Sequence, residues 1–172
     1  MLDCLVLGDS IAVGLGQARP ECVVVAVSGI TSERYVQTLL APRRARTVII
    51  SLGVNDGDGV PTTDNLRLLR RTIAADTVYW LLAGSNPRTR DAVRAVAGLY
   101  RDQLIDVAPL AGPDHVHPDR AGYAVLARET GGTTRPPSTP QHILSTRNDF
   151  RAFPGIKVWN GPGNLNGVPV RR

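Results

Sequence analysis

Four short apolar runs rich in β-branched residues recur along the first half of the chain, separated by stretches of different character. The runs cover residues 2–7, 22–27, 47–52 and 77–82. Short runs of nearly continuous apolar character are typical of strands that are covered on both faces. Strands that alternate with helices form a parallel sheet, because parallel neighbours need a long crossover connection. This pattern therefore predicts an α/β fold.

The stretches between the runs carry apolar residues at helical spacing. Thr31 supplies a helix cap at the start of one stretch, and Leu66, Leu69 and Ile73 share one helical face in another. Helices on both sides of a parallel sheet, joined by right-handed crossovers, leave few topologies. We expect helices over residues 31–40, 64–75, 87–104 and 119–129, and a fifth short strand near residues 104–107.

Three polar segments each follow a strand-like run. They are residues 8–10 (Gly-Asp-Ser), residues 53–56 (Gly-Val-Asn-Asp) and residues 114–118 (Asp-His-Val-His-Pro). In an open parallel sheet the ligand crevice lies at the carboxyl ends of the strands. Segments that are far apart in the sequence are therefore expected to meet at one rim of the sheet and to form one site.

The residue types in these segments are those of acyl-transfer chemistry. A serine hydroxyl is a poor nucleophile until a base within hydrogen-bond reach takes its proton. Asp114 and His117 are three residues apart, so the carboxylate can orient one ring nitrogen while the other faces a serine. Ser10 is the best-placed serine, and Ser28, before a turn glycine, is the reserve candidate. Ser51 is expected to stay inside its strand.

Attack on an ester carbonyl creates an oxyanion, which needs hydrogen-bond donors that are fixed in advance. The candidates are the backbone N–H groups of Ser10 and Gly29 and the side-chain amide of Asn55. Glycine at position 29 allows the backbone to approach a ligand closely.

These segments resemble the conserved blocks of the SGNH, or GDSL, hydrolase family. Residues 8–11 (Gly-Asp-Ser-Ile) resemble its nucleophile block, with isoleucine in place of the usual leucine, and Gly29 matches the lone glycine of its second block. Residues 53–56 match its third block, and residues 114–117 match its last block, an acid three residues before a histidine. Each motif alone is weakly specific, but all four occur in order within roughly residues 3–129.

The resemblance implies a flavodoxin-like three-layer α/β/α fold and a metal-independent serine hydrolase without a cofactor. It implies Ser10 as nucleophile and oxyanion donor, His117 as general base and Asp114 as the acid that orients the histidine. Gly29 and Asn55 become the other oxyanion donors. The family hydrolyses carboxylic esters and thioesters, acetylated sugars and lysophospholipids.

We therefore expect a serine esterase that acts through an acyl-enzyme on a small-molecule or saccharide acyl ester. The short loop over residues 55–61 and the lack of a long insertion favour an open, shallow site for short acyl groups such as acetyl. Asp9 is assigned a structural role in the nucleophile loop, and Tyr123 is interpreted as helix packing.

A metal site is the competing interpretation of the last segment, because His115 and His117 alternate on a short stretch beside Asp114. Further ligands are scarce, since the only other histidine is His142. Residues 55–59 alone resemble a weak cation loop, but the longer spaced pattern of an EF-hand is absent. No metal ligand is therefore assigned.

The C-terminal quarter changes in character. We expect residues 1–130 to form the SGNH-like hydrolase domain, residues 131–140 to form a linker rich in Gly, Thr and Pro, and residues 141–172 to form an irregular extension with one hairpin. Apolar residues in the extension motivate an alternative from another class: a non-catalytic binding or assembly module that docks through this tail. Contact with a partner or a second copy through residues 141–172 is part of that alternative.

The net charge of +5 does not predict a nucleic-acid partner. Apart from Lys157 and the histidines, the basic residues are arginines that are scattered among acidic residues on successive predicted elements. A nucleic-acid-binding surface concentrates such residues on one face, with aromatics between them. We expect an ordinary solvated surface, and a mildly cationic face that attracts anionic substrates is the lesser alternative.

The sequence offers neither a membrane span nor a visible secretory signal. The longest apolar runs are far shorter than the roughly 20 residues that a membrane-spanning helix needs, and no basic region precedes the first run. These features predict a cytoplasmic location, with release by another route left open. Cys4 and Cys22 are expected to be buried reduced thiols, although neighbouring strands can bring such a pair close.

Overall fold

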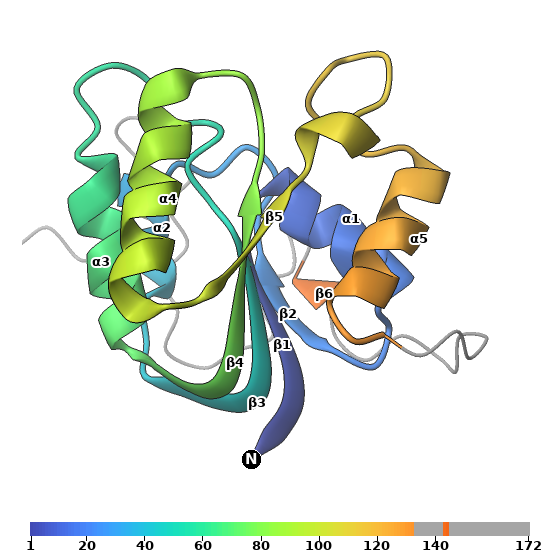
Figure 1. The fold of residues 1–172 in the computed structure, drawn as a ribbon. Coiled ribbons are helices and arrows are strands. Elements are labelled where there is room, and N and C mark those ends of the chain that lie inside the picture. Colours follow the sequence, from blue (N-terminus) through green and yellow to red (C-terminus); the bar gives the residue numbers. More distant parts are fainter. Residues whose placement is uncertain (133–142, 145–172) are drawn as a thin grey trace, which may run out of the picture.

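One parallel sheet forms the centre of the molecule in the computed structural model, which describes residues 1–132 and 143–144 (Figure 1). The strands are β1 (Leu2–Gly8), β2 (Val23–Ala26), β3 (Arg43–Ser51), β4 (Ile73–Leu82), β5 (Gln103–Asp106) and the two-residue β6 (Ile143–Leu144). Their order is β5-β4-β3-β1-β2-β6, and every pair is parallel. The first five strands have the flavodoxin-like order, so the predicted fold class is confirmed.

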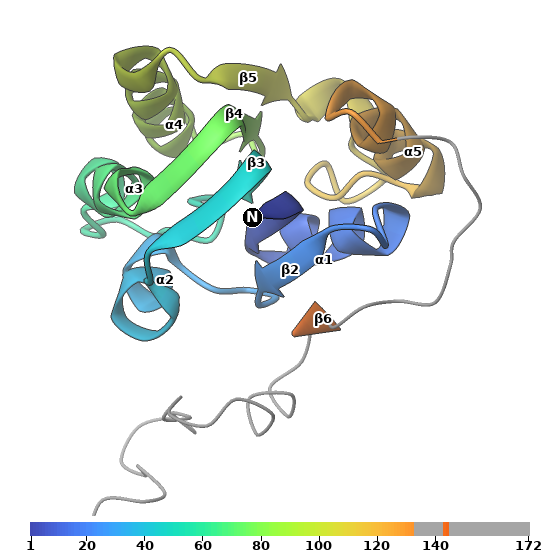
Figure 2. The ribbon, with the colours of Figure 1, turned by 90° about the horizontal axis from the view of Figure 1, so that it is seen from below.

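Helices cover both faces of this sheet. They are α1 (Ser10–Ala18), α2 (Ser32–Leu39), α3 (Thr62–Arg71), α4 (Pro87–Tyr100) and α5 (Arg120–Glu129), with a short 3-10 helix, η1 (Ala108–Leu110), before α5. Helices α2, α3 and α4 pack on one face, and α1 and α5 pack on the other (Figure 1, Figure 2). None of the helices in the described residues is long and apolar enough to cross a bilayer.

The apolar runs of the central strands contribute side chains to two hydrophobic cores, one on each face of the sheet. In β1, Leu5 and Leu7 are buried in the core under α2, α3 and α4, whereas Cys4 and Val6 are buried in the core under α1 and α5. Successive side chains of a strand point to opposite faces. A strand that is covered on both sides must therefore be apolar at nearly every position, as the sequence pattern indicated.

Two predicted helix ends differ from the structure. Ile73, which fits the helical spacing of residues 64–75, instead begins β4 and pairs with Arg43 of β3. Its side chain still enters the core that α3 also contacts, so burial alone did not distinguish helix from strand. The helix predicted to reach residue 104 ends at Tyr100, because Arg101 adopts a left-handed backbone with a φ of 56°.

The sequence pattern did not predict helix α1. Gly14 and Gly16 lower its intrinsic helix propensity. Both glycines face neighbouring elements: a Cβ added at Gly16 would lie 2.6 Å from the Val24 side chain, and one at Gly14 would lie 2.3 Å from the Tyr123 ring. Close packing against β2 and α5 thus accounts for the residues that made the helix hard to predict.

The tail predictions fall mostly outside the described residues. Residues 131–132 end the described part of the domain, and Ile143–Leu144 pairs with Val24 and Val25 at the edge of the sheet. The remaining linker residues 133–142, the expected hairpin and the rest of the extension lie outside the described residues.

The expectation of reduced thiols is wrong, because Cys4 and Cys22 form a disulfide. Cys4 lies on β1, and Cys22 directly precedes β2. The register that pairs Leu5 with Val23 puts the two cysteines side by side, with 4.5 Å between their Cα atoms. The bond spans 18 residues of chain, and these residues include all of α1.

Reduction of this disulfide is expected to lower the free energy of unfolding by about 3 kcal/mol, since the bond restricts a loop of this size in the unfolded chain. Urea unfolding curves of the oxidised protein and of the protein kept in dithiothreitol measure the difference. The double variant Cys4→Ala, Cys22→Ala is the control, because its curve should not respond to the reductant. Equal midpoints for the oxidised and reduced parent would contradict this expectation.

Candidate active site

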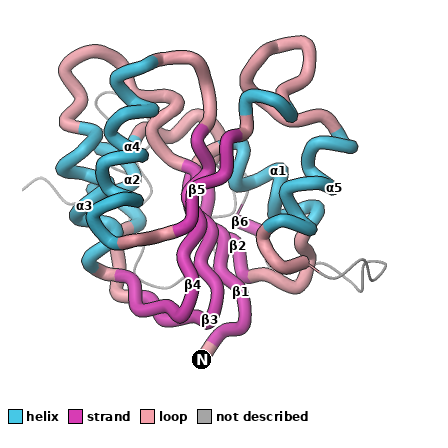
Figure 3. Tube along the Cα trace, in the orientation of Figure 1, coloured by secondary structure: helices cyan, strands magenta, loops and turns pink. Residues whose placement is uncertain are grey.

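The loops that follow the strands gather at one end of the sheet, where β1, β3 and β4 all finish (Figure 3). At the end of β1, Gly8 has a φ of 135°, which favours glycine. A Cβ at this position would lie 1.7 Å from the Ser51 carbonyl oxygen, which accepts a hydrogen bond of 2.9 Å from the Asp9 amide. The tight approach to β3 turns the chain so that Ser10 begins α1 at the rim.

Asp9 caps the helix that Ser10 begins. Its Oδ1 accepts hydrogen bonds from the Ile11 amide at 3.0 Å and from the Ser51 hydroxyl at 2.9 Å. The Asp9 residue has no exposed surface. The segment Gly-Asp-Ser is therefore a helix cap, and the same cap fixes the serine that the sequence analysis singled out.

A continuous set of hydrogen bonds joins the three residues predicted to be catalytic. The Ser10 Oγ lies 2.7 Å from the His117 Nε2, and the His117 Nδ1 lies 2.6 Å from the Asp114 Oδ2. With the ring proton on Nδ1, the histidine donates to the carboxylate and accepts from the serine hydroxyl. The side chains of His117 and Asp114 are 43% and 54% exposed, so the site is open to solvent on this side.

The loop that carries the histidine is held by Asp114 itself. Its Oδ1 accepts from the Val116 amide at 3.0 Å and from the His117 amide at 2.9 Å, around a left-handed His115 with a φ of 59°. The hydrogen bond from the Val116 amide, followed by those from His117, holds the pKa of the Asp114 carboxyl well below its usual range. Asp114 is therefore an anion throughout the neutral pH range.

The two predicted oxyanion segments lie on either side of the Ser10 loop, because β2 and β3 are the neighbours of β1 in the sheet. Gly29 lies in the loop after β2, with a φ of 75° and no atom within 4 Å of the place of a Cβ. Asn55 lies in the loop after β3, and its Nδ2 donates to the Ile30 carbonyl at 3.1 Å. This bond joins the two loops, and the second N–H of the Asn55 amide has no acceptor among the described residues.

Asp56 supports these loops, and the sequence analysis gave it no role. Its carboxylate accepts from the Ser32 amide and from the Thr62 hydroxyl, each at 2.7 Å, and it is 4% exposed. The Asn65 amide also donates to the Ser32 hydroxyl at 3.0 Å. Asp56 thus links the start of α2 to the start of α3. In the sequence, only its position next to Asn55 indicated that it belongs to the site.

The structure gives no hydrogen bond between His117 and either of the other two serines considered above, Ser28 and Ser51. Ser51 is buried in β3, as predicted, where its hydroxyl donates to Asp9. Ser28 is exposed in the loop after β2, and the His117 Nε2 is bonded to Ser10 instead. Ser10 is the serine that the fold brings to the histidine.

The competing metal site does not form in the described part of the chain. No group of three or more histidine, cysteine, aspartate or glutamate side chains gathers there in a way that could hold a metal ion. His142, which was the remaining candidate histidine, lies outside the described residues.

Known proteins resemble this chain in structure rather than in sequence. No family model matches the chain, and none of the curated proteins matches it. A Desulfitobacterium hafniense DCB-2 protein described as lipolytic and of the G-D-S-L family is 18% identical, with a TM-score of 0.47, over 74% of this chain and 97% of that chain. A Streptococcus pneumoniae protein described as a platelet activating factor is 16% identical, with a TM-score of 0.51, over 73% of this chain and 80% of that chain.

This chain and the Streptococcus pneumoniae protein share a fold. The chain therefore has the flavodoxin-like fold that the resemblance to the SGNH, or GDSL, hydrolases implied, and that resemblance is confirmed at the level of the fold.

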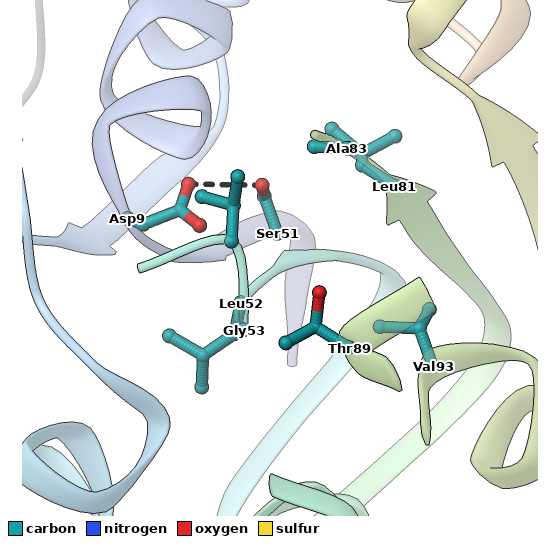
Figure 4. A pocket seen from close by; sticks show the side chains of 9 residues that line it. Asp9, Ser51, Leu52, Gly53, Leu81, Ala83, Thr89 and Val93 are labelled. Atoms are coloured by element: carbon teal, nitrogen blue, oxygen red, sulfur yellow. Dashed lines mark hydrogen bonds between the residues drawn. The ribbon is translucent and has the colours of Figure 1, made fainter. Parts of the chain in front are cut away.

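The buried Asp9 carboxyl is electrostatically unlike Asp114. Figure 4 shows it bonded to Ser51 at the edge of a small cavity that Thr89 and Val93 of α4 also line. The Asp9 Oδ2 has no hydrogen-bond partner among the described residues. Burial raises the Asp9 pKa to about 6, although the hydrogen bonds from Ser51 and Ile11 oppose the rise. The folded protein thus binds a proton that the unfolded chain releases near its ordinary pKa of 3.8.

Asp9→Asn is expected to stabilise the protein near neutral pH. Between about pH 4 and about pH 6 the folded parent binds more protons at this site than the unfolded chain, so its free energy of unfolding falls as the pH rises. Asparagine keeps an acceptor for Ile11 and Ser51 but does not ionise, so at neutral pH it avoids a cost on the order of 3 kcal/mol. The net gain is smaller than this, because the amide N–H groups at the Oδ2 position are buried without an acceptor among the described residues. Urea unfolding of both proteins across this pH range measures the difference. Parallel pH profiles for the two would contradict this assignment.

Proposed function

We propose that the chain is a serine esterase that hydrolyses acyl esters through an acyl-enzyme intermediate. The observation that carries the proposal is the unbroken set of hydrogen bonds from Ser10 through His117 to Asp114. Nucleophile, base and orienting acid in this geometry are the recurring arrangement of serine hydrolases on unrelated folds. The shared fold adds support, because the serine and the histidine both lie at the carboxyl end of the sheet.

Acylation begins when the Ser10 Oγ attacks the ester carbonyl carbon and its proton passes to the His117 Nε2. The carbonyl oxygen becomes an oxyanion, which accepts hydrogen bonds from the backbone N–H groups of Ser10 and Gly29 and from the Asn55 amide. The tetrahedral intermediate then breaks the bond to the leaving oxygen. His117 returns its proton to that oxygen, and the alcohol departs from an acyl-Ser10.

Deacylation repeats these steps with water. His117 takes a proton from the water, whose oxygen attacks the acyl carbon, and the same donors hold the new oxyanion. Collapse breaks the bond to the Ser10 Oγ, which takes the proton back from His117. The products are a carboxylic acid and the free enzyme.

Asp114 acts in both steps without changing its protonation state. Its low pKa keeps it ionised, so it fixes the ring tautomer and stabilises the imidazolium that forms when His117 holds the extra proton. Part of this stabilisation is screened, since the Asp114 side chain is more than half exposed.

The proposed substrates are small-molecule or saccharide esters with short acyl groups. The exposure of His117 and Asp114 favours an open site, which gives a long acyl chain little apolar surface to bind. Acetyl esters, including acetylated sugars, fit such a site best. The alternative of a docking module rests on residues 141–172, almost all of which lie outside the described residues.

Ser10→Ala is expected to lower kcat/KM for p-nitrophenyl acetate by at least about 10⁴-fold, because the attacking oxygen is lost. Ser28→Ala is the matched control. Ser28 follows the neighbouring strand β2 and is exposed, so the kcat/KM of this variant should stay within about twofold of the parent value. Ser10→Ala that hydrolyses the ester as fast as the parent would overturn the proposal.

Two further measurements distinguish a serine nucleophile from metal-assisted hydrolysis. The double variant Ser10→Ala, His117→Ala should be no slower than either single variant, because the two residues act as one unit. The parent should also keep its activity in excess chelator. Activity that is lost in chelator and restored by a divalent ion would favour metal-assisted hydrolysis instead.

A further inference from the structure

The ring of Tyr123 occupies the space that a side chain at Gly14 would fill. A Cβ at Gly14 would lie 2.3 Å from both the Cζ and the Oη of Tyr123, and 2.8 Å from its Cε1. Tyr123 lies in the first turn of α5, and Gly14 lies in the second turn of α1. At this contact the two helices pack with a glycine on one side and an aromatic ring on the other.

This contact lies about one helical turn along α1 from Ser10. Gly14 is four residues after Ser10, so both occupy the same face of α1. Tyr123 is six residues after His117, at the start of the helix into which the histidine loop leads. Ser10 and His117 come from different elements, and their 2.7 Å hydrogen bond depends on how those elements are spaced.

Both the ring and the hydroxyl of Tyr123 lie against Gly14. The Tyr123 hydroxyl forms no hydrogen bond within the described part of the chain, and the side chain packs against the core under α1 and α5. Burial, followed by the charges of Asp9 and Asp114, raises the pKa of Tyr123 to about 12. Tyr123 is thus a neutral, half-buried side chain that lies close enough to Asp9 and Asp114 to be affected by their charges.

We propose that Tyr123 is a positioning residue for the catalytic triad: its ring, seated on Gly14, sets the spacing between the nucleophile helix α1 and the loop that holds His117. The catalytic consequence rests on the proposed esterase function. A shift on the order of 1 Å between catalytic groups can cost about 10²-fold in rate. A contact one helical turn from Ser10 can therefore change kcat.

Gly14→Ala is the first test, with Gly98→Ala as its matched control. The new methyl group displaces the Tyr123 ring, so kcat for p-nitrophenyl acetate should fall at least about 10-fold, with KM within about twofold of the parent. Gly98 is also a helical glycine, but nothing lies within 4 Å of its added Cβ. Gly98→Ala should therefore keep the parental kcat.

A double-mutant cycle attributes the effect to the ring. Tyr123→Ala should lower kcat about as much as Gly14→Ala, whereas Tyr123→Phe, which keeps the ring, should stay within about twofold of the parent. In the Tyr123→Ala background, adding Gly14→Ala should cause no further loss, because the displaced group is already absent. An equal loss from Gly14→Ala in both backgrounds would overturn the proposal, as would parental kcat in Tyr123→Ala.

Proton NMR of the His117 ring gives a readout that needs no substrate. The Nδ1 proton that bonds to Asp114 should resonate at the same downfield position in the parent, Tyr123→Phe and Gly98→Ala, and should shift in Gly14→Ala and Tyr123→Ala. An unchanged resonance in both of the latter variants would overturn the positioning role. If the parent has no esterase activity but the two variants still shift the resonance, the proposed function is refuted and the positioning of His117 by Tyr123 stands.

Discussion

The parallel pairing of β1 between β2 and β3 is the constraint on which the rest of the site depends. It brings the loops after all three strands to one rim, with the nucleophile loop in the middle. The close approach of Gly8 and Asp9 to Ser51 then turns the chain into α1 at a fixed point. The pairing of β1 with β2 also puts Cys4 beside Cys22, so the disulfide follows from the β1–β2 register and the place of Ser10 from the β1–β3 register.

Two carboxylates near Ser10 have opposite electrostatic environments. Asp114 is exposed, accepts hydrogen bonds from the backbone and from His117, and remains charged. Asp9 is fully buried with one oxygen unpaired among the described residues, so its charge is destabilised. Asp114 is thus suited to stabilise the imidazolium that the proposed reaction forms on His117. The buried residue holds the turn, at a cost in stability that grows as the pH approaches neutrality.

The sequence predicted the elements whose physical signal is local, and it missed those that depend on tertiary contact. Strand alternation and the spacing of Asp114 and His117 are readable from residue types alone, because burial on both faces and hydrogen-bond reach dictate them. Helix α1 was missed because its glycines are explained only by the side chains that pack on them. Ile73 was assigned to a helix because helix and strand bury it in the same core. The disulfide needed the register of β1 and β2, which no spacing rule supplies, and the C-terminal extension remains a prediction.

Covalent labelling tests the central claim most directly. The protein is treated with a fluorophosphonate, digested and mapped by mass spectrometry, in parallel with the His117→Ala variant. We expect one adduct, on Ser10, that forms rapidly in the parent and at least about 10²-fold more slowly without the histidine base. An intact parent that shows no adduct, or an adduct on Ser28 in place of Ser10, would contradict a serine-hydrolase site built on Ser10 and His117.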